Sequence, residues 1–241
     1  MKNNDIDFSR LNVGRTLSRL IIERDNMAHL FRYAYICRQL KSPKIILDIG
    51  CGDKSLAAMI YTGKMRSKVI QYHGVDLKDV PSDILKDKLP FPMFFHKINI
   101  SEELPYVNPH IITCFEVIEH NTRENGIKLL DNISAVMNYQ TELYLSTPCL
   151  DENKGKQRFH VYEYTYDELK EELEKRFEII DHFGTFMHTG IGPNKAHIDD
   201  LCDDHKFAKI KEYYGGAIFS NIMAVFQPER AKNCIWRLKK K

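Results

Sequence analysis

The sequence has no CxxC pair, no apolar leader at its N-terminus and no uncharged run long enough to span a bilayer. Its six cysteines are scattered, so neither a zinc knuckle nor a disulfide framework is indicated. The first ten residues, MKNNDIDFSR, lack the apolar core of a signal peptide. We therefore expect a reduced, cytoplasmic protein with no membrane partner.

A strong charge of one sign is also lacking. Lys and Arg number 35 against 33 Asp and Glu, and the net charge of +2 is too small to indicate a nucleic-acid partner, although it does not exclude one. With 43% hydrophobic and 28% charged residues over 241 positions, the chain has an ordinary globular composition and can bury a sizeable core. No pattern indicates an oligomeric state.

Short apolar runs alternate with longer amphipathic segments along the chain. Strands are predicted at 45–49, 69–75, 93–98, 111–115, 142–146, 177–183 and 217–226. Helices are predicted at 55–61, 125–138 and 165–175, the last with a capping-box spacing from Thr165 to Glu168. The alternation predicts an α/β fold, with a seven-stranded, mostly parallel sheet covered by helices on both faces.

The stretch KIILDIGCGDKS, residues 44–55, places Asp48, Gly50 and Gly52 at the end of the first predicted strand. Ligands of open α/β sheets bind beyond the carboxyl ends of the strands, and glycine lets the backbone approach them closely. The next apolar run, YHGVDL, ends at Asp76, whose carboxylate can accept both hydroxyls of a ribose. A dinucleotide site is disfavoured, because Ser55 stands where GxGxxG has its third glycine.

The segments ILDIGCGD, GVDL, INI and IITCFEVIEH, in this order, resemble the cofactor-binding motifs of class I S-adenosylmethionine-dependent methyltransferases. The resemblance covers about residues 44 to 183 and implies a Rossmann-like fold with S-adenosylmethionine as cofactor. It implies that Asp48, Gly50, Cys51 and Gly52 lie along the methionyl and ribose side, that Asp76 binds the ribose hydroxyls, that Leu77, Asn99 and Ile100 surround the adenine, and that Phe115 follows the methionine moiety. The sequence departs from the family pattern at Lys54, in place of a third glycine, and at Asn99, in place of Asp.

We expect one methyltransferase domain over residues 1–241. Within it, 1–42 form an N-terminal helical cap, 43–184 the cofactor-binding core, 185–216 a lid or substrate-binding insertion, and 217–241 the final strand with a solvated basic tail. The insertion is predicted because some thirty residues pass without a strand signal, and such stretches are often lids or binding loops.

Four side chains are candidates for the chemistry. Glu116, Glu119 and His120 leave the fourth strand at positions i, i+3 and i+4, which lie on one face of a helical turn, and His160 follows the fifth strand. Three roles stay open for them: holding a divalent ion such as Mg²⁺ or Mn²⁺, acting as a metal-free base with Glu119 orienting a histidine, or capping the loop. The pattern is similar to that of small-RNA 2′-O-methyltransferases and quinone-pathway O-methyltransferases.

The sequence therefore predicts an S-adenosylmethionine-dependent methyltransferase that acts on oxygen in a small-molecule, sugar or nucleotide-like acceptor. Oxygen is favoured because the Glu/His group offers a base or a metal site to a hydroxyl. The alternatives are an RNA ribose 2′-O-methyltransferase, which a basic stripe on the structure would favour, and a non-catalytic binding subunit that retains the cofactor fold.

Overall fold

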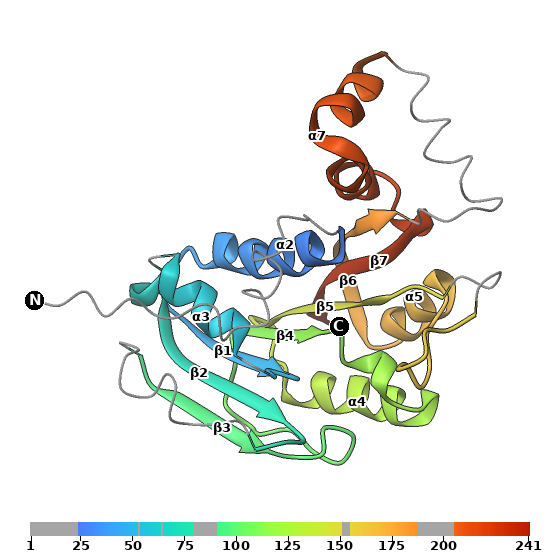
Figure 1. Cartoon of the computed structure of the whole chain (residues 1–241). Helices are drawn as coiled ribbons and strands as arrows, with labels where there is room; N and C mark the ends of the chain where they lie inside the picture. Colours follow the sequence, from blue (N-terminus) through green and yellow to red (C-terminus); the bar gives the residue numbers. More distant parts are fainter. Residues whose placement is uncertain (1–23, 53, 64, 80–90, 151–154, 188–204) are drawn as a thin grey trace, which may run out of the picture.

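A seven-stranded sheet with strand order β3-β2-β1-β4-β5-β7-β6 runs through the molecule (Figure 1). The computed structural model describes residues 24–52, 54–63, 65–79, 91–150, 155–187 and 205–241. Neighbouring strands from β1 to β5 are parallel, whereas β7 is antiparallel to both β5 and β6. The strands are β1 Lys44–Ile49, β2 Val69–Asp76, β3 Met93–Lys97, β4 Ile111–Phe115, β5 Glu142–Pro148, β6 Phe177–Met187 and β7 Ala231–Lys240. The predicted mostly parallel α/β sheet is confirmed.

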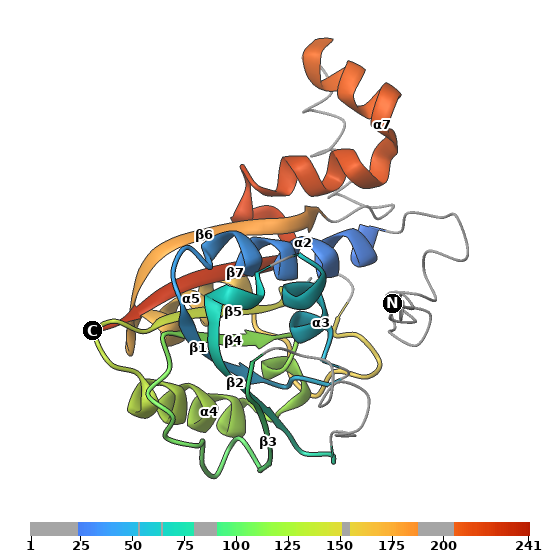
Figure 2. The same cartoon turned by 90° about the vertical axis from the view of Figure 1, so that its left-hand side faces the viewer.

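Helices cover both faces of the sheet, as predicted (Figures 1 and 2). One face packs against α2 and α3 through a core that includes Ile36, Leu56 and Tyr72, and the other packs against α4 and α5 through Leu129, Leu169 and their neighbours. The helices are α2 Arg24–Gln39, α3 Ser55–Thr62, α4 Arg123–Val136, α5 Tyr166–Glu174 and α7 His205–Ala224, with short 3-10 turns η2 Arg66–Lys68, η3 Ile118–His120 and η5 Pro228–Arg230. No helix among the described residues is both long and apolar enough to cross a membrane.

The register brings the ends of three strands together at one edge of the sheet. Asp48 on β1 lies beside Gly74 on β2 and Thr113 on β4. Because these strands are parallel, the loops that follow β1, β2 and β4 all leave from the same edge. The motifs that the sequence places after these strands therefore meet there.

The capping box predicted for α5 is present. Thr165 accepts a hydrogen bond from the backbone of Glu168, and the Glu168 side chain accepts one from the backbone of Thr165. The two reciprocal bonds satisfy backbone donors at the start of the helix, so α5 begins where the sequence pattern places it.

The prediction of a final strand at 217–226 is wrong. Those residues lie largely in α7, where Phe219 and Met223, four positions apart, are buried and Ile222 is partly exposed, which is a helical rather than an alternating pattern. The last strand is β7, and it includes Lys239 and Lys240, so the expected solvated tail is part of the sheet. Short apolar runs fit a helix or a strand equally well, and here tertiary packing decides.

The other segments of the expected organisation are partly described. Helix α2 lies within the predicted N-terminal cap, and residues 1–23 fall outside the described residues. Of the predicted lid, residues 185–187 belong to β6 and residues from His205 onward to α7, whereas 188–204 lie outside the described residues. Helix α7 packs on β6 and α2 and extends away from the sheet (Figures 1 and 2).

Candidate functional site

The loop after β1 contains the two glycines of the first motif. Gly50 and Gly52 have φ angles of +71° and +46°, which L side chains rarely adopt. A Cβ on Gly50 would stand 2.3 Å from a methyl carbon of Val117, so this glycine permits close packing against the loop after β4. Among the described residues, the nearest atom to a Cβ on Gly52 would be the Gly50 carbonyl oxygen at 3.9 Å, so the second glycine leaves more room than the first. Between them, Cys51 is buried and its backbone N–H donates to the Val75 carbonyl.

Asp48, near the end of β1, is buried and has donors on both carboxylate oxygens. The Thr113 hydroxyl donates to Oδ1 at 2.6 Å, and the Tyr72 hydroxyl donates to Oδ2. Burial and the charge of Asp48 raise the pKa of Tyr72 well above its ordinary value, so the phenol remains a donor. Asp48 therefore ties β1 to both of its neighbouring strands beside the glycine loop.

Asp76 connects the first two motifs at the end of β2. Its Oδ2 accepts from the backbone N–H of Gly52 at 3.1 Å, and its Oδ1 accepts from that of Lys78 at 3.0 Å. The next side chain, Leu77, is 61% exposed. An exposed apolar side chain beside an oriented carboxylate is an arrangement that suits a nucleoside, with the base on the leucine and the ribose on the acid.

The remaining predicted cofactor residues differ in exposure. Asn99, which is partly buried, donates from its amide to Glu102 at 2.7 Å and accepts from the Ser101 hydroxyl at 2.9 Å, so its side chain organises its own turn. Ile100 and Phe115 are buried and belong to the cores on opposite faces of the sheet. These two residues therefore lie in the packed interior next to the strand ends that form the site.

Lys54 replaces the third glycine of the motif while keeping a glycine-like backbone. It is the N-cap of α3, with φ of 66° and ψ of 26°. Its side chain is buried, and Nζ lies 4.7 Å from the centroid of the Phe95 ring. This distance is typical of a cation–π contact, so the lysine packs between α3 and β3.

Glu116, directly after β4, is fully engaged by the protein. Its carboxylate accepts from Ser146 at 2.8 Å, from Asn233 at 2.9 Å on both oxygens, and pairs with the Arg32 guanidinium at 3.1 Å. Burial opposes the charge, but Arg32 and the hydrogen bonds outweigh it and hold the pKa of Glu116 below its ordinary value. Glu116 is therefore an ionised carboxylate in a network formed by side chains of α2, β5 and β7.

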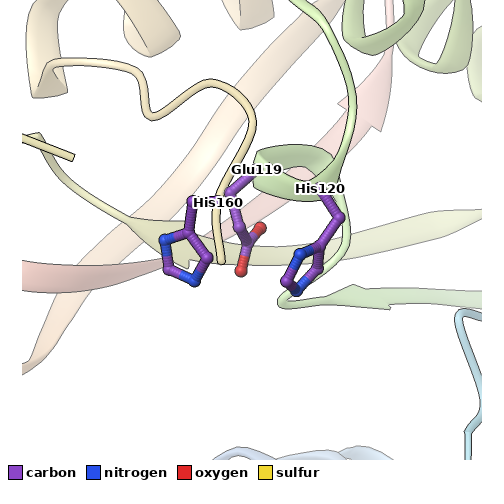
Figure 3. A group of neighbouring side chains, drawn as sticks. All are labelled: Glu119, His120 and His160. Atoms are coloured by element: carbon purple, nitrogen blue, oxygen red, sulfur yellow. The ribbon is translucent and has the colours of Figure 1, made fainter. Parts of the chain in front are cut away.

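Glu119, His120 and His160 form a second group, whose ligand atoms all lie within 4.8 Å of one another. Figure 3 shows the carboxylate between the two imidazole rings, with Glu119 and His120 on η3 and His160 on the segment before α5. The backbone N–H of Val161 donates to the Glu119 carbonyl at 2.8 Å, which holds the two segments together. The structure thus brings three of the four predicted catalytic side chains into one group, and Glu116 is not among them.

Both histidines of this group have a partner at Nδ1. Nδ1 of His120 lies 3.3 Å from the Phe159 carbonyl oxygen, and Nδ1 of His160 pairs with the Glu163 carboxylate. Because both partners accept, each Nδ1 carries a proton, and Nε2 of each neutral ring is an acceptor. Such a partner fixes the tautomer of metal-bound histidines in known sites.

One oxygen of Glu119 lacks a partner. Oε2 accepts from the Thr147 hydroxyl at 2.9 Å, whereas Oε1 is buried with no hydrogen bond in the described part of the chain. Burial and the charge of Glu116 raise the pKa of Glu119 well above its ordinary value. An unpartnered buried carboxylate is costly, so the group is completed by a proton or by a cation.

Several residues of the site were not predicted from the sequence. Glu163 follows His160 by three positions, and this spacing is the only local signal that marks it. Arg32 and Asn233 stand 201 positions apart in the chain, so no motif relates them. Thr147 is recognisable only through its register at the end of β5.

Comparison with protein families supports the motif assignment. A family model described as a methyltransferase domain matches residues 22–188. No curated protein sequence gives a significant match to the chain.

Proteins whose solved structures have similar folds catalyse different reactions. The 1,6-didemethyltoxoflavin-N1-methyltransferase of Burkholderia thailandensis, bound to S-adenosylhomocysteine, has a TM-score of 0.58 and 16% identity over 95% of this chain and 82% of that one. The [4+2]-cyclase SpnF has a TM-score of 0.58 and 17% identity over 88% of this chain and 80% of its own. The small RNA methyltransferase HEN1 has a TM-score of 0.58 and 16% identity over 88% of this chain but only 25% of its own. At such identities the likeness shows the fold, and the acceptor must be argued from the site.

Proposed function

Because this chain belongs to the methyltransferase domain family and is an S-adenosylmethionine-dependent methyltransferase, we propose that it methylates a hydroxyl oxygen of a small-molecule, sugar or nucleotide-like acceptor. One observation carries the proposal: two histidines with acceptor Nε2 atoms converge with a buried, incompletely bonded carboxylate. A hydroxyl needs help in losing its proton, and such a group supplies it.

The cofactor lies, in this proposal, over the ends of β1 and β2. Asp76 accepts the ribose hydroxyls and Leu77 packs on the adenine, since the carboxylate and the exposed leucine are adjacent. Gly52 leaves space for the ribose and methionyl side, and Asp48, Gly50 and Cys51 form the wall behind it. Asn99, Ile100 and Phe115 complete the adenine and methionine surroundings.

Glu119, His120 and His160 fit a divalent cation such as Mg²⁺ or Mn²⁺. The donor set of one carboxylate and two imidazoles is chemically suited to Mn²⁺ in particular, and the unpartnered Oε1 of Glu119 supplies a vacant acceptor. When bound, such a cation lowers the pKa of a coordinated hydroxyl. Glu116, saturated by Arg32 and Asn233, stays outside this ligand set.

The chain's own task in methyl transfer is orientation. The acceptor oxygen attacks the methyl carbon in line with the cofactor sulfur, so the S–CH₃ bond breaks as the O–CH₃ bond forms. The hydroxyl proton leaves by way of the group of Glu119, His120 and His160 and then passes to solvent. The close packing of Gly50 on Val117 fixes the glycine loop against the turn that carries Glu119 and His120. We call the loops after β1 and β2 the cofactor edge, and Glu119, His120 and His160 the hydroxyl-activating group. The contact between Gly50 and Val117 sets the distance between the two.

One observation favours RNA ribose as a second candidate acceptor. The segment before His160 presents the exposed side chains of Lys156 and Arg158 beside Phe159, which is 80% exposed. Basic side chains next to an exposed aromatic ring suit single-stranded RNA, which stacks its bases on such rings. Binding of a short RNA oligomer that is weakened by Phe159→Ala would support this candidate, and equal binding by both proteins would reject it.

The test is calorimetric titration of the full-length protein. S-adenosylhomocysteine is expected to bind wild type and to lose affinity at least about tenfold in Asp76→Ala, because the ribose loses its acceptor. Mn²⁺ is then titrated into wild type, Glu119→Gln and the control Glu124→Gln, whose carboxylate is 77% exposed on α4. Loss of Mn²⁺ binding in Glu119→Gln alone supports the metal site.

Two results would contradict these assignments. If S-adenosylhomocysteine binds Asp76→Ala as well as wild type, the proposed cofactor placement is wrong. If Mn²⁺ does not bind wild type and an acceptor is methylated equally in EDTA, the histidines act as a metal-free base.

A further inference from the structure

A buried arginine contacts Glu116 and belongs neither to the loops after β1 and β2 nor to the group of Glu119, His120 and His160. Arg32, on α2, is 1% exposed, and it touches none of the ligand atoms of Glu119, His120 or His160. Its Nη1 lies 3.1 Å from both the Glu116 carboxylate and the Asn233 amide oxygen, and its Nη2 lies 2.6 Å from Nδ1 of His29. A buried guanidinium held by several partners has a defined position, so it can transmit that position to the groups it binds.

The backbone of Glu116 is the second observation. Its φ is +57°, in the left-handed region that residues other than glycine adopt rarely. Such a conformation persists when the surrounding structure over-determines it, and it is concentrated at functional sites. Here the backbone N–H donates to the Ser146 carbonyl at 2.9 Å, and the side chain is fixed by Arg32, Asn233 and the Ser146 hydroxyl.

This left-handed residue determines where the chain goes after β4. Val117 follows it and packs against Gly50, and η3, with Glu119 and His120, begins at the next residue. The direction of η3 therefore depends on the turn at Glu116. Arg32 is the charged anchor of that turn, and it comes from a helix that precedes the whole sheet in the chain.

We propose that Arg32 is a positioning residue: through Glu116 it holds the left-handed turn that aims Glu119 and His120 toward His160. The inference rests on the proposed function of that group, because it assigns α2 a part in building it. Helix α2 is then a component of the hydroxyl-activating site, whereas the carboxylate of Asp76 is held by the backbone of Gly52 and Lys78 and has no contact with Arg32.

The experiment compares two ligands and one spectroscopic signal in the full-length protein. Binding of S-adenosylhomocysteine reports on the cofactor edge, and binding of Mn²⁺ reports on the hydroxyl-activating group. The ring Cε1–H NMR signals of His120 and His160 report on the geometry of the turn. The variants are Arg32→Met, Arg32→Lys and the double variant Arg32→Met/Glu116→Met, which removes both charges. Arg38→Met, at an exposed position on the same helix, is the matched control.

Arg32→Met is expected to weaken Mn²⁺ binding at least tenfold and to shift the His120 signal, with S-adenosylhomocysteine affinity within twofold of wild type. Arg32→Lys restores part of the Mn²⁺ affinity, and Arg38→Met changes nothing. If Arg32→Met does not fold, the double variant replaces it, and it is expected to fold yet still bind Mn²⁺ weakly. Full Mn²⁺ affinity and an unshifted His120 signal in the double variant would overturn the proposal.

If Arg32 has only a structural role, the result is different: the affinities for S-adenosylhomocysteine and Mn²⁺ and the melting temperature then all decrease together. That outcome overturns the positioning role while leaving the proposed function intact. If wild type itself fails to bind Mn²⁺, the metal part of the proposed function fails instead. The histidine signals then decide the role of Arg32 alone: unshifted signals in Arg32→Met reject it, and shifted signals with normal S-adenosylhomocysteine binding support it.

Discussion

Glu116 and Glu119 lie three residues apart after the same strand, yet the protein treats their carboxylates in opposite ways. Glu116 accepts from Ser146, Asn233 and Arg32, and its pKa is held below the ordinary value. Glu119 is buried and has one side-chain donor, Thr147, among the described residues, and its pKa is raised by burial and by the charge of Glu116. A shared motif therefore assigns no shared role, because the role depends on which donors the fold brings to each oxygen.

Neutralising Glu116 is expected to have the largest effect on the stability of the protein. Glu116→Gln leaves the Arg32 charge buried without its counterion, and we expect a loss of about 3–5 kcal/mol in the free energy of unfolding at pH 7. Glu119→Gln removes an uncompensated carboxylate and is expected to be neutral or stabilising in EDTA. Urea unfolding of both variants measures this, and equal destabilisation would show that the two carboxylates are not in opposite environments.

The pH dependence of stability sharpens the same contrast. With its pKa raised, Glu119 contributes stability that is fully present below the unfolded pKa of about 4.3 and is lost as pH rises through its folded pKa. With its pKa lowered, Glu116 contributes stability that is present above about 4.3 and is lost as pH falls through its folded pKa.

Relative to wild type in EDTA, Glu119→Gln is therefore expected to become more stable as pH rises from 4 to 8. Glu116→Gln is expected to lose its disadvantage only in acid. Each unit of pKa shift corresponds to about 1.4 kcal/mol. Melting curves across this range test both, and parallel curves for the two variants would contradict the opposite shifts.

A third buried glutamate, Glu163, contacts one of the two histidines. Glu163 holds Nδ1 of His160 and is 5% exposed. Glu163→Gln weakens that partner, and Mn²⁺ affinity is expected to fall about 10- to 100-fold, as for other groups that orient metal-bound histidines. Glu171→Gln, at an exposed position on α5, is the control in the same titration. Unchanged affinity in Glu163→Gln would show that the histidine needs no support.

The smallest expected effects come from two adjacent residues of β5 that each serve one glutamate. Thr147 supplies the hydrogen bond that Glu119 receives, whereas Ser146 is one of several donors to Glu116. Thr147→Val is expected to cost about 1 kcal/mol and Ser146→Ala less, since the other donors to Glu116 remain. Chemical denaturation at pH 7 measures both, and a larger cost for Ser146→Ala would reverse the assignment.

Strands β1, β2, β4 and β5 were predictable from the sequence because parallel strands buried on both faces produce continuous apolar runs such as IILDI. The position of Asp48, Gly50, Gly52 and Asp76 at the carboxyl ends of β1 and β2 was predictable for the same reason, since these acids and glycines end those runs. Strand β7 was not predictable, because the terminal lysines 239–241 are typical of a solvated tail. In the structure β7 includes Lys239 and Lys240, and Arg237 in the same strand pairs with Glu142 on β5 at 2.8 Å.

The grouping of Glu119, His120 and His160 was predictable only in part. Glu119 and His120 belong to one motif and His160 follows a strand end, so strand order alone brings them to the same edge. The separation of Glu116 depends on Arg32 and Asn233, which lie near opposite ends of the chain. A partner at such sequence separation leaves no local pattern, and only the packing of α2 and β7 reveals it.

The late position of β7 in the chain also has a consequence for folding. Both β5 and β6 are synthesised before β7, which then inserts between them. Until that insertion, two strand edges face an open slot, and such edges pair readily with other chains. Asn233 arrives with β7, so the network around Glu116 closes only in that step. A synthetic peptide of residues 231–240 is therefore expected to compete with β7 for this slot during refolding.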